Sequence, residues 1–559
     1  MISTDPNKKP FDVILVSGDY WADHPHSGIG VIARILEAEG FSIGILEKPD
    51  WRSTKDIKKF GLPNLFYGVT SGAIDSMLQN YTPLKKLRSE DPYKPFSSEI
   101  PDRAIIVYSQ LIRRAQKEFS QGSFIPIIIG GVEASLRRFT HYDYWDNKVR
   151  RPILFDAKAD LLVYGPGENQ IKQIASRLKN KQGLENIAGT CLISKKSAES
   201  FGKVEFSKKL FEILPSYKEV THDNKLFCKM QIQFSNQKNL VQQVDNRAIV
   251  QYKMHNYTSK ELDALYELPF SYKIPEKFKE FQMTKFSIIT HRGCFGNCSF
   301  CSIALHQGTK IISRSIENIT SEIKRMTEFS DFKGYISDIG GPSANMYGMD
   351  CLNAYTCENN CIECSILNKS HENALELLQE SRKIEGIKKT FVRSGIRYDL
   401  AIDYYEYLKE LSEHHISGNL KIAPEHFSPK VSTLMNKPND RFDEFKEKFD
   451  KINKPLKQHL KYYFITAHPG STMEDVYDLR KKLEELGFQN TESIQIFTPT
   501  PMSISTCMYY TGLNPSTLEP VYIPYTYNEK KKQKNLLYPS NQYQIRKKSE
   551  NKKEKKDEK

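Results

Sequence analysis

Short apolar segments with the character of buried strands alternate with amphipathic helical segments in the first third of this chain. Residues 12–17, 41–47 and 124–131 are strand-like, and the helical segment between the first two ends at Gly40, a residue typical of helix C-termini. Strands separated by helices join through right-handed crossovers into a parallel sheet covered on both faces. Residues 8–182 are therefore predicted to form an N-terminal doubly wound α/β domain.

The same alternation returns at residue 284 and continues to residue 510, with about six strand–helix units. Polar residues follow the predicted strands, which is where a β/α barrel presents its chemistry. We therefore expect a partial (β/α)6 barrel at 284–510. Residues 183–283 are less regular and are interpreted as a linker region with some structure of its own, and residues 511–559 as a C-terminal extension that ends in a disordered basic tail.

Composition places the chain among multidomain globular proteins of the cytoplasm. Its 559 residues exceed what one ordinary core supports, and the polar N-terminus "MISTDPNKKP" has no apolar signal segment. The longest apolar runs have strand length, so no membrane association is expected. Ten cysteines in such a chain favour reduced thiols and metal or redox chemistry over a disulfide framework.

The net charge of +13 is concentrated at the C-terminus. Residues 529–559 contain twelve Lys or Arg and five Asp or Glu, which gives +7 and leaves +6 for the rest of the chain. Such a low-complexity segment is typical of a solvated, disordered terminus. It gives only weak support for nucleic acid as a partner.

Three cysteines are crowded into the segment "THRGCFGNCSFCSIALHQG", which follows the first predicted barrel strand. Cys294, Cys298 and Cys301 form a C-x3-C-x2-C pattern, and glycines within it permit tight turns. A structural zinc site usually has four protein ligands, whereas three thiolates suit a [4Fe–4S] cluster with one open iron. A zinc site completed by His291 or His306 is the alternative.

The remaining cysteines fall into a second group and three separate residues. Cys351, Cys357, Cys361 and Cys364 form C-x5-C-x3-C-x2-C. A second Fe–S cluster, a zinc site and an unliganded set of reduced thiols all remain open for this group. Cys191 and Cys228 are isolated in the sequence and are interpreted as structural, while Cys507, near the last predicted strand, is a candidate for substrate chemistry.

Several long motifs make the chain similar to the YgiQ family of radical SAM proteins. They include "GGVEASLRRFTHYDYWDNKVRR", "CSIALHQGTKIISRSIENI", "DIGGPSANMYG" and "FTPTPMSISTCMYYTG". The resemblance implies that Cys294, Cys298 and Cys301 hold a [4Fe–4S] cluster whose unique iron binds S-adenosylmethionine. Reductive cleavage then yields a 5′-deoxyadenosyl radical, with the electron supplied by a donor such as flavodoxin or ferredoxin. The resemblance implies no particular substrate.

The resemblance also suggests residues that contact S-adenosylmethionine. Gly340 and Gly341 end the second barrel strand, where the family lets backbone groups approach the methionyl end of the cofactor. The family pattern has an acidic residue next, but Pro342 and Ser343 follow here, so the contact to the amino group is unassigned. Ser394, Arg397 and Glu425 lie at later strand ends and are candidates for carboxylate and ribose contacts, with surface or salt-bridge roles as the alternative.

The N-terminal domain resembles the cobalamin-binding domains of some radical SAM enzymes. A protein cobalt ligand would require D-x-H-x-x-G, but "DHPHSG" at 23–28 has the wrong spacing, so we do not expect cobalamin held in that way. Residues 136–151 combine four arginines with Tyr142, Tyr144 and Trp145. They could stack on a nucleobase or a corrin-like ring, but a role in joining domains is the favoured interpretation.

Two further functions stay open beside a radical SAM enzyme of unknown substrate. The possible second cluster suggests a methylthio or methyl transferase acting on RNA or protein. A non-catalytic Fe–S protein for electron transfer or nucleic-acid binding is the alternative from another class.

Overall fold

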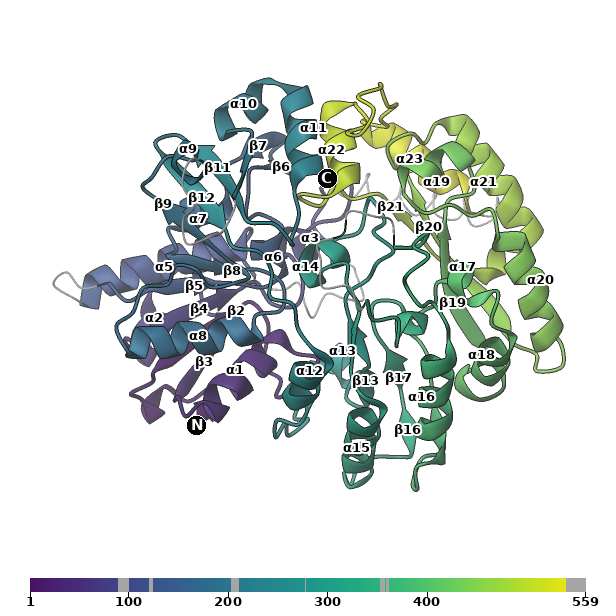
Figure 1. Ribbon diagram of the computed structural model, residues 1–559, viewed down its shortest axis with the longest axis horizontal. Helices are drawn as coiled ribbons and strands as arrows, with labels where there is room; N and C mark the ends of the chain where they lie inside the picture. Colours follow the sequence, from purple (N-terminus) through teal and green to yellow (C-terminus); the bar gives the residue numbers. More distant parts are fainter. Residues whose placement is uncertain are drawn as a thin grey trace, which may run out of the picture.

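The computed structural model describes residues 1–88, 100–119, 124–202, 211–276, 278–351, 357 and 361–538. Two α/β halves lie side by side, with the N-terminal sheet on the left of Figure 1 and the C-terminal half on the right. In the described part of the chain, no helix has the length and apolar character needed to cross a membrane.

The N-terminal half is built on one sheet of ten strands. Its order is β1-β3-β2-β4-β5-β8-β9-β12-β11-β10, and the strands from β1 to β8 are parallel. The parallel strands are β1 (Ile2–Ser3), β2 (Val13–Ser17), β3 (Ile43–Glu47), β4 (Phe66–Thr70), β5 (Ile127–Ile129) and β8 (Leu161–Val163).

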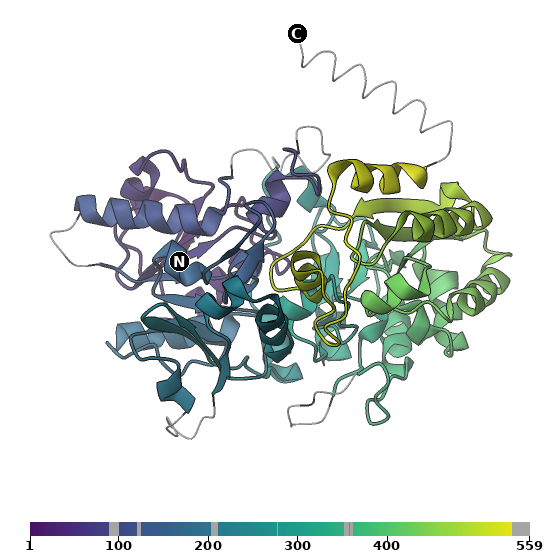
Figure 2. The same cartoon turned by 90° about the horizontal axis from the view of Figure 1, so that it is seen from above.

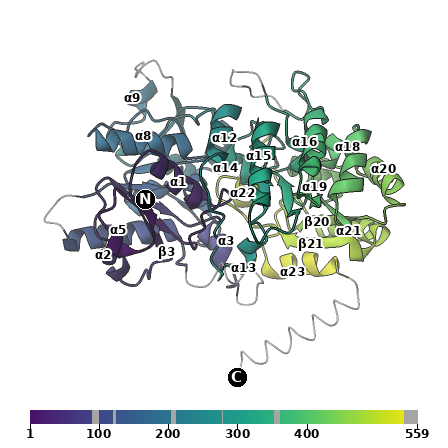
Figure 3. The same ribbon diagram turned by 90° about the horizontal axis from the view of Figure 1, so that it is seen from below.

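Helices cover both faces of this sheet, as a doubly wound fold requires (Figure 3). Val13 and Leu15 of β2 belong to the core shared with α1 (Gly28–Ala38) and α8 (Glu168–Lys179). Ile14 and Val16 point to the other core, with α2 (Lys55–Phe60), α5 (Ala104–Phe119) and α7 (Ile153–Ala157). The side-chain alternation of one strand thus serves two cores, and the predicted doubly wound architecture is confirmed.

The region predicted to be a linker instead continues the sheet. β9 (Thr190–Ser194), β12 (Arg247–Gln251) and β11 (Leu240–Val244) pair antiparallel beyond β8, and β10 (Glu212–Leu214) pairs parallel at the edge. Two buried glutamines interrupt the apolar pattern by which these strands could be recognised in the sequence. Gln242 accepts a hydrogen bond from the Thr140 amide at 3.1 Å, and Gln251 accepts one from Arg138 at 2.8 Å. The linker prediction for 183–283 is therefore wrong over these strands.

The C-terminal half contains the expected six barrel positions. Its parallel ladders are β13–β17, β16–β18 and β19–β20–β21, and no ladder among the described residues joins β13 to β21, so the barrel is partial. The strands are β13 (Ser287–Ile289), β16 (Tyr335–Ile336), β17 (Asp338–Gly340), β18 (Lys389–Thr390), β19 (Asn419–Glu425), β20 (His459–Thr466) and β21 (Thr491–Ile496).

Amphipathic helices cover the outside of this half. They are α15 (Ile316–Thr327), α16 (Glu372–Lys383), α18 (Tyr405–Glu410), α20 (Phe442–Asn453) and α21 (Met473–Leu486). Further helices along the whole chain are α3 (Ser76–Asn80), α6 (Val132–Ser135), α9 (Glu199–Gly202), α10 (Tyr217–His222), α11 (Asn224–Gln233), α12 (Ser259–Tyr266), α13 (Lys279–Gln282), α14 (Ile303–Gln307), α17 (Tyr398–Ala401) and α19 (Pro429–Leu434).

The C-terminal extension begins with ordered structure rather than with a tail. After α22 (Ile504–Thr511), α23 (Tyr527–Leu536) lies along the barrel half in Figure 2. The buried Gln533 accepts a hydrogen bond from the Ala467 amide and donates one to the Ser471 carbonyl, both at 2.8 Å. The prediction of a solvated terminus from residue 529 is therefore wrong for 529–538, while 539–559 lie outside the described residues.

Candidate functional site

The cysteine loop leaves the barrel directly after β13. Its base is closed by β14 (His291–Arg292), which pairs antiparallel with β15 (Ile312–Ser313). Gly293 starts the loop with a φ of +84°, and a Cβ at this position would lie 1.9 Å from the Lys310 carbonyl oxygen. Only glycine fits a backbone that turns so close to the returning strand.

Arg397 lies against the middle of the loop. A Cβ on Gly296 would lie 2.7 Å from Arg397 Nη1 and 3.4 Å from Cys294 Sγ, so this glycine leaves room for the guanidinium. Arg397 Nη1 is 3.8 Å from Cys298 Sγ, and its Nε donates to Asp399 at 2.9 Å. The structure thus places a cation predicted from the sequence directly beside one of the three thiols.

The outer side of the loop is held by hydrogen bonds to the end of the barrel. Asn436 Nδ2 donates to the Asn297 carbonyl at 3.0 Å, and the Ser299 amide donates to the Met435 carbonyl at 2.9 Å. The Ser505 amide, on α22, donates to the Ser299 carbonyl at 2.9 Å. These contacts fix the thiol-bearing segment from two separate elements.

The three thiols are near enough to interact electrostatically. Burial raises the pKa of Cys301 to about 12 and also raises that of Cys294, and in both cases the charge of Cys298 adds to the increase. The positive charge of Lys437 opposes this increase in the pKa of both thiols. Its ammonium group also pairs with Glu425 at 3.2 Å. Lys437 was not predicted from the sequence, because it follows a short helix with no local motif.

The glycines at the end of β17 are packed closely by their neighbours. A Cβ on Gly340 would lie 2.7 Å from Ser394 Oγ, and one on Gly341 would lie 2.5 Å from His291 Cε1. The Ser394 hydroxyl donates to Asp338, which also accepts the Ser394 amide at 3.2 Å. Asp338 therefore supplies a carboxylate on this strand, two residues before the glycines rather than after them.

The two histidines proposed as zinc ligands have other partners. His291 is hydrogen-bonded to Thr290 Oγ1 at 2.8 Å, and His306 Nδ1 is 2.9 Å from Ser135 Oγ on α6. Across the described ranges, no group of three or more His, Cys, Asp or Glu side chains is arranged to hold a single metal ion. A cluster of four irons spaces its thiolates farther apart than one ion does, so this finding concerns mononuclear sites such as the zinc alternative.

The thiols of the second cysteine group are also near enough to interact electrostatically. Burial raises the pKa of Cys361, and the charges of Cys351, Cys357 and Cys364 add to this effect. Three of these thiols and Cys294 pack on one apolar cluster, which consists of Phe295, Ile311, Met346, Met349, Leu367 and Leu400. Residues 352–356 and 358–360 lie outside the described residues.

Cys228 and Cys507 are close in space although 279 residues separate them in the sequence. Their sulfur atoms are 3.8 Å apart between α11 and α22, and both side chains are buried. The hydrogen bond from Cys507 lowers the pKa of Cys228 to about 7, whereas burial raises that of Cys507. Cys228 is therefore not isolated, and Cys507 lies on a helix rather than at a strand end.

The histidines of "DHPHSG" connect the two halves of the molecule. His24 Nε2 is 3.0 Å from the Lys285 carbonyl oxygen and His26 Nε2 is 3.2 Å from that of Ser287, at the start of the barrel. Asp23 pairs with Arg34 and accepts a bond from the Ser271 amide at 3.0 Å. Asp23, His24 and His26 therefore have partners within the protein, which agrees with the expectation that this segment does not ligate cobalt.

The aromatic residues of 136–151 join the halves, as the favoured interpretation predicted. Tyr142 stacks on Tyr510 of α22 with ring centroids 4.7 Å apart, and Tyr144 meets Tyr509 edge-on at 5.6 Å. Lys530 of α23 donates to the hydroxyl groups of Tyr509 at 2.9 Å and Tyr144 at 3.2 Å. Burial between these rings lowers the pKa of Lys530 to about 8.

Three family descriptions match this chain. "Radical SAM N-terminal" matches residues 4–291, "Radical SAM superfamily" matches 288–483, and a domain of unknown function, DUF3362, matches 492–552. The first match includes the strands that extend the N-terminal sheet. The second includes the cysteine loop and five of the six barrel positions.

Curated relatives match over almost the whole chain. A UPF0313 protein of Methanosarcina acetivorans is 42% identical over 95% of this chain and 76% of its own length. A UPF0313 protein of Clostridium botulinum is 44% identical over 94% of this chain and 84% of its own length. A third UPF0313 protein, from Fusobacterium nucleatum, is 41% identical over 94% of this chain and 95% of its own length.

A solved structure supports the arrangement of the two halves. The radical S-adenosylmethionine methyltransferase TsrM from Kitasatospora setae superposes with a TM-score of 0.50 at 14% identity, covering 89% of this chain and 76% of that chain. A second structure of TsrM, with cobalamin and a [4Fe–4S] cluster bound, gives the same TM-score. At this identity the likeness concerns the fold, which agrees with the predicted domain–barrel architecture.

Proposed function

Because this chain belongs to the UPF0313 family, the YgiQ-type proteins of the radical SAM superfamily, we propose that Cys294, Cys298 and Cys301 hold its [4Fe–4S] cluster. A radical SAM domain implies an enzyme that uses this cluster and S-adenosylmethionine. The observation that supports the ligand assignment is the donor set itself. Three mutually interacting thiols on one glycine-bearing loop after β13 suit a cluster with one open iron.

When bound, the cluster supplies the electron that cleaves S-adenosylmethionine to methionine and a 5′-deoxyadenosyl radical. The chain's own residues would bind the cluster and orient the loop that holds it. Arg397 and Lys437 place two positive charges beside the thiols, where they offset the negative charge of thiolate ligands. Gly293 and Gly296 let the loop turn and admit the guanidinium.

Gly340, Gly341, Ser394, Arg397 and Glu425 form the proposed binding surface for S-adenosylmethionine. Arg397 contacts the Cys298 thiol, and Gly340 and Ser394 are in mutual contact. Glu425 takes part through its ion pair with Lys437. Asp338 is added to this set, because its carboxylate holds Ser394 at the end of β17.

Cleavage of S-adenosylmethionine tests this proposal directly. The full chain is loaded with iron and sulfide without oxygen, reduced with dithionite and incubated with S-adenosylmethionine. We expect 5′-deoxyadenosine, quantified by mass spectrometry, well above the amount formed by a variant lacking all three loop cysteines. Equal amounts from both proteins would contradict the proposal and favour a non-catalytic Fe–S protein.

The second cysteine group is proposed to hold a second Fe–S cluster. Four thiols that interact, three of which share an apolar cluster with Cys294, support a site close to the first one. Changing Cys351, Cys357, Cys361 and Cys364 together to Ser should lower the iron content by about four per chain and leave 5′-deoxyadenosine formation largely intact.

A buried single cysteine provides the matched control for that change. Cys191→Ala alters a fully buried thiol away from both groups in the sequence and should leave the metal content unchanged. A loss of one zinc instead of four irons would select the zinc alternative. Unchanged metal content would contradict any metal at the second group.

The proposed setting is the cytosol, with a small reduced protein such as flavodoxin or ferredoxin as electron donor. None of the ten cysteines is paired in a disulfide, which agrees with a reducing compartment. No cobalamin held through a protein ligand is proposed, since His24 and His26 bind backbone carbonyls of the barrel half.

A further inference from the structure

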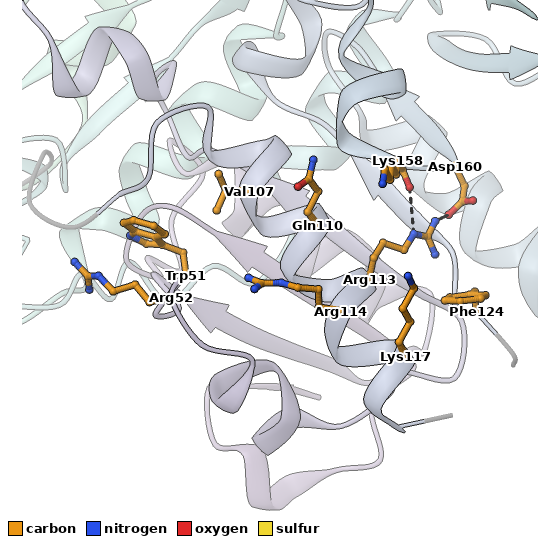
Figure 4. A pocket seen from close by; sticks show the side chains of 10 residues that line it. All are labelled: Trp51, Arg52, Val107, Gln110, Arg113, Arg114, Lys117, Phe124, Lys158 and Asp160. Atoms are coloured by element: carbon orange, nitrogen blue, oxygen red, sulfur yellow. Dashed lines mark hydrogen bonds and ion pairs between the residues drawn. The ribbon is translucent and has the colours of Figure 1, made fainter. Parts of the chain in front are cut away.

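A groove runs along the outward face of α5, away from the cysteine loop. Its volume is about 770 Å³, and the side chains that line it are drawn in Figure 4. Val107, Gln110, Arg114 and Lys117 form one stripe of α5, at helical spacings of three and four residues. Figures 1 and 2 both place α5 at the outer edge of the N-terminal half.

The groove carries strong positive charge. Five of its lining side chains are cations and one, Asp160, is an acid. Arg113 is neutralised by Asp160 at 2.6 Å and is anchored to the Lys158 carbonyl at 3.1 Å. In contrast, the side chains of Arg114, Lys117 and Lys158 have no hydrogen-bond or ion-pair partner within the described ranges.

Like charges that line one groove repel each other. Arg114 and Lys117 are exposed on the last two turns of α5, and Lys158 follows α7 on the neighbouring element. Three cations that line one groove from two elements are suited to the phosphates of a polyanion, because each contact releases a bound counterion.

Aromatic side chains occupy the two ends of the same groove. Trp51 lies at one end with Arg52 over its ring at 4.9 Å, and Phe124 lies at the other with Arg113 at 5.8 Å. Phe124 is 52% exposed, so part of its ring is open to solvent, and Trp51 is half-buried. Accessible rings beside cations form the stacking platforms used for unpaired bases.

We propose that this groove binds single-stranded nucleic acid, with phosphates on Arg114, Lys117 and Lys158 and bases stacked on Trp51 and Phe124. An acidic peptide would use the cations without needing the rings, and a duplex would not offer its base faces. This binding requires neither the cluster nor S-adenosylmethionine, so it can fail or succeed independently of the proposed enzymatic activity.

The test measures binding of a fluorescein-labelled oligouridylate of about ten nucleotides to the full, cluster-loaded chain by anisotropy over a salt series. The variant Arg114→Gln, Lys117→Gln, Lys158→Gln should bind at least about tenfold more weakly at low salt. The slope of log affinity against log salt should fall in magnitude by about 2, because each phosphate contact on a single strand contributes about 0.7.

A matched variant separates the groove from general positive charge. Lys409→Gln, Lys430→Gln, Lys451→Gln removes the same charge from exposed positions of the barrel half and should change neither quantity appreciably. Every protein compared keeps the basic C-terminus, so its contribution is common to all. An equal loss in the two triple variants, or no binding by the unaltered chain at low salt, overturns the proposal.

A second pair of variants tests the stacking. Trp51→Ala and Phe124→Ala should each weaken binding by about tenfold while leaving the salt slope unchanged. An oligothymidylate arm distinguishes RNA from DNA within the proposed class. If polyglutamate or duplex competes as well as the oligouridylate and the aromatic variants bind normally, the surface is a site for bare negative charge and the proposal is wrong.

Discussion

Replacement of Cys294, Cys298 or Cys301 by Ala is expected to abolish 5′-deoxyadenosine formation and to remove one cluster's worth of iron. Each thiolate would hold a different iron, so no remaining side chain substitutes for a missing one. His291 and His306, the nearest histidines in the sequence, are each hydrogen-bonded through Nδ1, to Thr290 and Ser135 respectively. Iron and sulfide analysis together with the visible absorbance of each variant provides the measurement.

The expected loss of iron depends on the second cysteine group. If that group holds its own cluster, each single variant should retain about half of the iron while losing all cleavage activity. If it holds none, the iron should fall to background. Cys191→Ala controls for the change from thiol to methyl and should keep both signals. Full iron content and normal cleavage in all three loop variants would contradict the ligand assignment.

The alternation of strands and helices predicted the two halves because their cores are made by local patterns. Each predicted barrel strand carries its own apolar run and its own flanking helix, so the units can be read one at a time. The cysteine loop was equally easy to recognise, since its three cysteines lie within eight residues of one another. The sequence therefore predicts those parts of the site that are made of residues close to one another in the chain.

The errors have a different physical origin. Gln242 and Gln251 are buried because hydrogen bonds from another segment satisfy them, so an apolar pattern could not reveal their strands. α23 looks like a solvated tail because it is rich in lysine, yet Lys530 and Gln533 are buried by partners contributed by distant segments. In each case a polar side chain is buried because its hydrogen-bond partners come from segments that are distant in the sequence.

Parts of the site that were missed follow the same rule. Lys437 reaches the loop thiols only because the segment after α19 folds back and bonds to Asn297 and Ser299. Cys228 meets Cys507 only because α11 packs on α22. Arg397, by contrast, was predicted from its strand end, and the structure adds the contact with Cys298 that gives it a role.

Gly293→Ala is the second change for which a large effect is expected. The residue has a φ of +84°, and its Cβ would lie 1.9 Å from the Lys310 carbonyl oxygen and 2.8 Å from the carbonyl carbon. The conformation alone costs about 1–3 kcal/mol for a non-glycine residue. The clash adds to this cost, because backbone at the β15 side of the loop cannot move without breaking the strand pair at its base.

Gly308→Ala is the matched control that separates these two contributions. Gly308 belongs to the same loop and has a φ of +93°, but its Cβ would meet only Met254 Sδ, at 3.4 Å. It should therefore show the conformational cost without the clash and retain most of its iron. Gly293→Ala should unfold at a lower denaturant concentration than Gly308→Ala and load much less iron, since the turn that aims Cys294 is displaced. Equal iron loading in the two variants would show that the close approach of the loop to Lys310 does not position the thiols.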